Sequence, residues 1–108
     1  RCFTYIDDTA RGTYLAGVTQ AAEGTVVNLG NPVETSILEL AERIRALVGS
    51  KSPIRFVTYE DHFGPGFEDT KRRVPDASRA QQLLGWTPTI DLDAGLARTL
   101  EWWKSKHG

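Results

Sequence analysis

The chain has 108 residues, 40% hydrophobic and 25% charged, with a formal net charge of -1 at pH 7. This composition is typical of one globular domain with a core. Because the net charge is close to zero, its electrostatic field does not favour binding to nucleic acid or to anionic membranes. The single cysteine, Cys2, excludes an internal disulfide and favours a reducing compartment, so we expect a cytoplasmic protein. No apolar run reaches membrane-spanning length. The chain opens on Arg1 without a flexible leader, and we expect it to be part of a longer protein.

Two strands and a helix are predicted near the start of the chain. Residues 1–5 alternate polar and apolar side chains, which is typical of a short strand. Asp7 and Asp8 can cap free N–H groups and complement the dipole of a helix that we expect from about residue 8 to residue 21. A compact run of β-branched residues predicts the second strand at residues 25–29.

The clearest predicted helix runs from Ser36 to Gly49. Ser36 and Glu39 match a capping box, and Gly49 suits the left-handed residue that closes a helix. Its apolar residues repeat at helical spacing and predict one buried face, formed by Ile37, Leu40, Ala41, Ile44, Leu47 and Val48. A third strand is predicted at residues 53–59. The loop that follows, residues 60–71, is long enough to be typical of a functional loop.

Arg72 and Arg73 lie just before a short helix that is predicted over residues 77–84. Pro75 disfavours helical geometry in the residue before it, and Asp76 can accept backbone N–H bonds as the helix cap. Two guanidinium groups beside a helix N-terminus can form an anion site, for which phosphate is the expected ligand. Salt bridges at the surface or between domains explain the same arginines equally well.

A last helix is predicted to begin at Asp91, with its buried side formed by Leu92, Leu96, Leu100 and Trp103. The expected order is strand, helix, strand, helix, strand, helix, helix. The sequence therefore predicts a single α/β domain over residues 1–108 with few short strands and four helices. We expect parallel pairing between strands that are joined through helices.

The sequence lacks the common cofactor-binding and metal-binding motifs. Gly64-Pro65-Gly66 does not follow a strand and open a helix, as a dinucleotide fingerprint requires, and no P-loop occurs. His62 and Cys2 have no cluster of further ligands around them, so we predict no metal site. No catalytic residue is predicted either.

The charged residues around the Arg-Arg pair also limit the function. The basic run Lys71–Arg73, even with Arg79, is too small beside Glu68 and Asp69 to predict nucleic-acid binding. Glu68 and Asp69 can accept hydrogen bonds from sugar hydroxyls, or they can simply form a solvated acidic loop. The strongest functional candidates are the arginines, Arg1 among them.

Four collinear segments together resemble the extended short-chain dehydrogenase/reductases that act on nucleotide sugars. They match the family patterns R-x-F-x-Y-V-x-D, V-N-L-G-N-P, S-I-L-E-L-A-E-x-I-x-x-L-x-G and R-x-P-D…L-G-W-x-P, and here they are residues 1–8, 27–32, 36–49 and 73–88. The resemblance is closest to UDP-glucuronate decarboxylases and UDP-glucose 4-epimerases, and it covers nearly the whole chain.

The resemblance implies that the chain is the C-terminal, substrate-binding portion of such an enzyme. In the family an N-terminal Rossmann domain binds NAD and carries a Tyr-x-x-x-Lys pair, and neither that pair nor the glycine fingerprint occurs here. NAD would oxidise a sugar hydroxyl and so enable epimerisation, decarboxylation or elimination. We therefore expect a UDP-sugar ligand, a homodimeric parent enzyme, no cofactor in these residues and no activity from them alone.

The resemblance also assigns roles to individual residues. Arg1 matches the arginine that contacts the nucleotide diphosphate, Arg73 matches the arginine that reaches the substrate, and Asp69 matches a carboxylate that binds the ribose in epimerases. Gly66 stands where some epimerases have a further phosphate-binding arginine, which counts against a galactose epimerase.

Two other interpretations remain open. The chain could be a stand-alone α/β interaction module that kept the scaffold without the catalytic domain. It could also pair two copies through apolar helix faces. The coding sequence upstream of Arg1 distinguishes the module from the enzyme.

Overall fold

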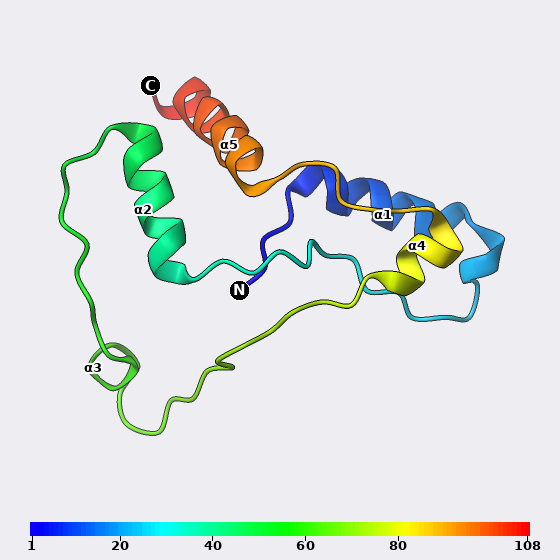
Figure 1. The fold of residues 1–108 in the computed structure, drawn as a ribbon, viewed down its shortest axis with the longest axis horizontal. Coiled ribbons are helices and arrows are strands. Elements are labelled where there is room, and N and C mark those ends of the chain that lie inside the picture. Colours follow the sequence, from blue (N-terminus) through cyan, green and yellow to red (C-terminus); the bar gives the residue numbers. More distant parts are fainter.

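The computed structural model describes all residues from Arg1 to Gly108 and shows a helical chain (Figure 1). Five α-helices and one 3-10 helix are present: α1 (Ile6–Val18), η1 (Gln20–Ala22), α2 (Ile37–Val48), α3 (Tyr59–Phe63), α4 (Ser78–Leu84) and α5 (Leu92–His107). The four predicted helices are confirmed as α1, α2, α4 and α5. The short helix α3 lies at the start of the segment predicted as a loop. None of these helices has both the length and the apolar character needed to cross a lipid bilayer.

The three predicted strands are wrong. Residues 1–5, 25–29 and 53–59 contain no strand, and the only β contact is an isolated antiparallel bridge between Cys2 and Glu34. A strand requires a neighbour in register that accepts and donates its backbone hydrogen bonds. These segments have a strand-like composition but lack such neighbours, so the few short strands of the predicted α/β fold are not formed.

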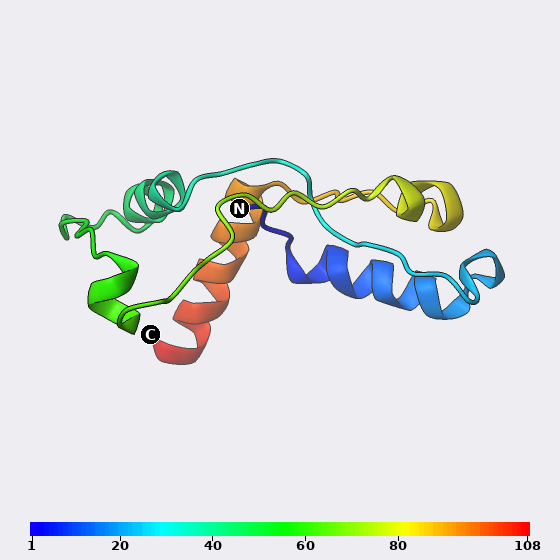
Figure 2. The same ribbon diagram turned by 90° about the horizontal axis from the view of Figure 1, so that it is seen from below.

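The chain is open rather than compact, as two perpendicular views show (Figures 1 and 2). Its radius of gyration is 17.2 Å, whereas a compact domain of this length has about 13 Å. Its accessible surface is 8283 Å², against about 6000 Å² for a compact monomer of this mass. Only 8 of the 108 residues are buried, so the chain leaves much of its apolar surface uncovered.

The best-packed part joins α1 and α4. The Trp86 side chain is fully buried, and its indole N–H donates a hydrogen bond of 2.9 Å to the backbone oxygen of Asp8. Gly12 allows this approach, because a Cβ atom there would lie 2.9 Å from Trp86 Nε1 and 2.7 Å from a Leu29 methyl carbon. Trp86, which follows the short helix α4, therefore closes a small core.

Asp8 is a buried anchor rather than a helix cap. The N-cap residue of α1 is Tyr5, which makes no side-chain cap. The Asp8 carboxylate is 2% exposed and accepts hydrogen bonds of 2.9–3.0 Å from the Thr89 hydroxyl and from the backbone N–H groups of Thr89 and Ile90. Burial opposes ionisation of Asp8, but these bonds and the Arg11 guanidinium outweigh it and lower the pKa of its carboxyl.

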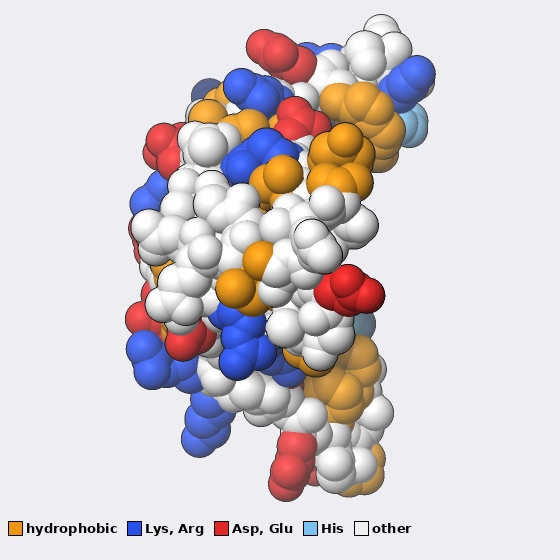
Figure 3. Space-filling view, turned by 90° about the vertical axis from the view of Figure 1, so that its right-hand side faces the viewer, with side chains coloured by type: hydrophobic (Ala, Val, Ile, Leu, Met, Phe, Trp, Pro, Cys, Tyr) orange, Lys and Arg blue, Asp and Glu red, His pale blue; other side chains and the backbone are white.

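The apolar faces of the longer helices stay largely exposed. No residue of α2 is buried, although α2 and α5 contact each other. Figure 3 shows hydrophobic side chains lying open on one face of the molecule. The residues of the predicted buried faces that are 39–60% exposed include Ile37, Ile44, Leu47, Val48 and Trp103. The predicted burial of these faces is therefore wrong for this chain by itself.

Candidate functional site

A wide cleft lies where three segments that are far apart in the sequence meet. Its volume is about 730 Å³, and both Arg1 and Arg73 line it. The other lining residues come from the same N-terminal segment, from residues 27–30 and from residues 74–76. The structure thus brings two guanidinium-bearing residues to one cavity.

A short loop fixes the two arginine-bearing segments relative to each other. Gly30 packs directly on Pro75, because a Cβ atom at residue 30 would lie 2.6 Å from the ring carbon Cγ of Pro75. The neighbouring Asn31 backbone N–H donates a 3.0 Å hydrogen bond to the Thr4 hydroxyl. The Gly30-Asn31 loop therefore braces both the segment that follows Arg1 and the segment that follows Arg73.

The two guanidinium groups meet at Thr70. Arg1 donates to the backbone oxygen of Thr70 and forms an ion pair with the Asp69 carboxylate. Arg73 donates a 3.2 Å hydrogen bond to the Thr70 hydroxyl. Arg1, Asp69 and Arg73, which the resemblance singles out, therefore lie next to one another, although Arg1 and Asp69 are 68 positions apart in the sequence.

Asp69 also accepts a hydrogen bond from a residue that the sequence did not single out. The Tyr59 hydroxyl lies 3.0 Å from Asp69 Oδ2. This bond and the charge of Arg1 lower the pKa of the Asp69 carboxyl. The same bond raises the pKa of the Tyr59 hydroxyl. The sequence predicts Tyr59 at the end of a strand, and only its place just before the acidic loop points to this role.

Arg72 does not share the cleft with Arg73. Its guanidinium makes two bonds to the Glu34 carboxylate, with Nε at 2.6 Å from Oε1 and Nη2 at 3.1 Å from Oε2. Of the two alternatives left open for the Arg-Arg pair, the salt bridge thus applies to Arg72. This pair ties the segment before Arg73 to the one that carries the bridge with Cys2.

The predicted corner before α4 is formed in part. Asp76 accepts a 3.0 Å bond from the Ser78 backbone N–H, as expected, although the N-cap position falls on Ala77 and Arg72 points to Glu34. That bond and the Ser78 hydroxyl lower the pKa of the Asp76 carboxyl. The helix has only seven residues. The arginines, not a helix dipole, therefore supply the positive charge of the cleft.

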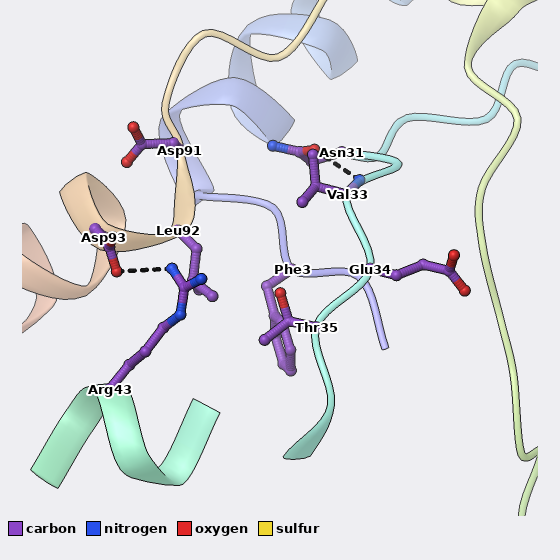
Figure 4. A pocket seen from close by; sticks show the side chains of 9 residues that line it. All are labelled: Phe3, Asn31, Val33, Glu34, Thr35, Arg43, Asp91, Leu92 and Asp93. Atoms are coloured by element: carbon purple, nitrogen blue, oxygen red, sulfur yellow. Dashed lines mark hydrogen bonds and ion pairs between the residues drawn. The ribbon is translucent and has the colours of Figure 1, made fainter. Parts of the chain in front are cut away.

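A second, smaller cavity of about 240 Å³ lies beside the N-termini of α2 and α5 (Figure 4). Its single cation, Arg43, is bound to Asp93 at 2.9 Å and to Glu39 at 2.7 Å. Figure 4 shows this arginine reaching across to Asp93 while Glu34 points away from the cavity. Because its cation is already neutralised, this cavity offers no comparable anion site.

No protein-family model matches the chain. Curated proteins do match it. The chain is 33% identical over 104 residues to a UDP-N-acetyl-alpha-D-glucosaminuronate decarboxylase of Bacillus cytotoxicus. This match covers 96% of this chain and 32% of that protein. It is 38% identical over 102 residues to UDP-glucuronic acid decarboxylase 1 of Danio rerio, covering 94% of this chain and 22% of that protein.

A solved structure matches it as well. UDP-glucuronic acid 4-epimerase from Bacillus cereus, in complex with UDP-glucuronic acid and NAD, superposes with a TM-score of 0.83 at 32% identity. The match covers 99% of this chain and 32% of the epimerase. The chain thus spans about a third or less of the length of the relatives that it matches.

Proposed function

We propose that residues 1–108 are the nucleotide-sugar-binding domain of an NAD-dependent UDP-sugar epimerase or decarboxylase of the extended short-chain dehydrogenase/reductase family. The premise is that this chain matches the C-terminal part of such enzymes. Its ligand is a UDP-sugar, as the names of the relatives suggest. In this proposal the chain binds the diphosphate and the nucleoside.

The observation that carries the proposal is the convergence of Arg1 and Arg73 on one cleft. Asp69 balances the charge of Arg1, whereas Arg73 forms no ion pair, and its guanidinium donates one hydrogen bond, to the Thr70 hydroxyl. Guanidinium groups bind phosphate oxygens through charge-assisted hydrogen bonds. In this arrangement Arg73 offers an uncompensated positive charge to the diphosphate, and the adjacent Asp69 can accept a ribose hydroxyl.

These residues do not fit NAD, which solved neighbours contain. A dinucleotide fingerprint places its glycines between a strand and a helix N-terminus, but Gly64 and Gly66 follow the short helix α3, and no strand precedes it. The sequence also lacks a Tyr-x-x-x-Lys pair. We therefore assign cofactor binding and catalysis to the other two thirds of a parent protein that is as long as the relatives. We expect that parent protein to be a homodimer, and we expect no activity from residues 1–108 alone.

The uncovered surface of this chain supports the proposal that a second part of the protein binds the cofactor. The chain exposes about 2300 Å² more than a compact monomer of its mass, from 8283 Å² against about 6000 Å². A surface of that size is in the range that obligate interfaces bury. An NAD-binding portion, of the length that the relatives have beyond this match, is the occupant that we propose for the exposed helix faces.

Titration of the chain with UDP tests the binding site. Hydrogen bonds to charged groups contribute about 1.5–3 kcal/mol, so Arg73→Ala should raise the Kd for UDP about tenfold or more. Arg72→Ala is the matched control, since Arg72 binds Glu34 and does not line the cleft, and it should change the Kd less than about twofold. Equal losses in both variants, or none in Arg73→Ala, would contradict the proposed site.

A further inference from the structure

We propose that Tyr59 is a positioning residue that holds Asp69 against Arg1 at the edge of the arginine-lined cleft. This inference rests on the proposed function and adds a residue to its binding site. It begins from a single acceptor atom. Asp69 Oδ2 accepts a 3.0 Å hydrogen bond from the Tyr59 hydroxyl and a second hydrogen bond from the Arg1 guanidinium.

The position of Asp69 also controls the place where the two arginines meet. Thr70, the next residue, accepts a hydrogen bond from Arg1 through its backbone oxygen and a second hydrogen bond from Arg73 through its hydroxyl oxygen. A shift of the Asp69 backbone therefore moves both contacts together. The Tyr59 hydroxyl is the neutral side-chain donor that restrains this carboxylate, so it orients both guanidinium groups although it does not line the cleft.

An aromatic cluster fixes the Tyr59 ring. Its ring centroid lies 5.4 Å from that of Phe67 and 6.4 Å from that of Phe63, and Phe63 and Phe67 stack at 4.2 Å. Phe67 stands two residues before Asp69, so the cluster joins the two ends of the loop. All three rings remain 43–57% exposed. The cluster thus presents the hydroxyl to Asp69 without depending on a buried core.

The protonation states suit this role at neutral pH. Hydrogen bonding to Asp69 raises the pKa of Tyr59, so its hydroxyl keeps the proton that it donates. The bond from Tyr59, followed by the charge of Arg1, lowers the pKa of Asp69, so the carboxylate stays ionised. Arg1 is the charged group that faces Asp69.

The test is Tyr59→Phe, which keeps the ring in its cluster and removes only the hydroxyl. NMR titration of the Asp69 carboxyl should show its pKa moving up toward the ordinary value of an aspartate. The Kd for UDP should rise about threefold to tenfold. Tyr14→Phe is the control, because Tyr14 is 68% exposed and does not line the cleft, and it should leave both quantities unchanged.

Each outcome decides the inference. If the pKa of Asp69 is the same in Tyr59→Phe as in the wild type, the proposed hydrogen bond is contradicted. If the pKa of Asp69 rises but the Kd for UDP does not change, the proposed positioning role is contradicted. A far-ultraviolet circular dichroism spectrum like that of the wild type shows that the variant is folded. If the wild-type chain itself does not bind UDP, the proposed function fails, while the Asp69 titration still reports whether Tyr59 holds the carboxylate.

Discussion

The unit formed by α1, η1, α4 and residues 85–90 differs sharply from the segment of residues 50–71. The first holds five of the eight buried residues, namely Asp8, Gly12, Ala22, Ala80 and Trp86, and the second holds none. The first is closed by packing and by the bonds around a buried carboxylate. The second is attached to the cleft through polar contacts of Asp69 and Thr70. Regions with few buried contacts open most easily, so one edge of the proposed binding site is its least stable part.

The largest expected effect comes from the packed unit. Trp86→Ala removes a fully buried side chain and its bond to the Asp8 backbone. Such truncations cost about 3–5 kcal/mol, which urea denaturation should detect as a large loss or as an unfolded chain. Trp102→Ala, at a residue that is 57% exposed, should change the free energy of unfolding by no more than about 0.5 kcal/mol. Similar losses at both residues would erase the contrast between packed and open regions.

A smaller effect concerns pH and the same unit. Because folding lowers the pKa of Asp8, its contribution to stability is fully present above the ordinary aspartate pKa of about 3.9 and is lost as the pH falls through the lower, folded pKa. Asp8→Asn should therefore flatten the loss of stability in acid. At pH 7 it should cost about 1–3 kcal/mol, because the amide nitrogen cannot accept the hydrogen bonds that one of the two carboxylate oxygens accepts.

Thermal unfolding measured between pH 7 and pH 2 checks this dependence. Asp7→Asn is the control at pH 7, because the Asp7 side chain is 68% exposed and makes a single ion pair of 3.7 Å with Arg98, so we expect a change of a few tenths of a kcal/mol. An Asp8→Asn variant with the same acid sensitivity as the wild type would show that Asp8 does not anchor the unit.

Local signals in the sequence predicted the helices because capping acts within a few residues. Ser36 accepts from the Glu39 N–H at 3.0 Å, and Asp91 accepts from the Ala94 N–H at 2.8 Å, as capping rules require. Gly49 and Gly85 close their helices with φ of 65° and 64°. The resemblance to extended short-chain dehydrogenase/reductases is also confirmed by the relatives and structural neighbours.

Contacts between distant residues could not be predicted in this way. Strand pairing depends on a neighbour that no local pattern specifies, and the predicted strands are absent. Asp8 looked like a cap, yet it binds Thr89 across 81 positions. Arg72 and Arg73 are adjacent and alike, and only the fold sends one to Glu34 and the other to the cleft. The binding roles of Arg1, Asp69 and Arg73 stay predictions.

The most direct measurement observes the guanidinium groups themselves during binding. In an NMR titration that follows the arginine Nε–Hε signals, UDP should shift the signals of Arg1 and Arg73 with one common Kd and leave the Arg72 signal in place. Uridine, which lacks the diphosphate, should leave the Arg73 and Arg72 signals unchanged. A UDP titration in which Arg1 and Arg73 do not respond, or respond with different Kd values, would contradict a shared diphosphate site.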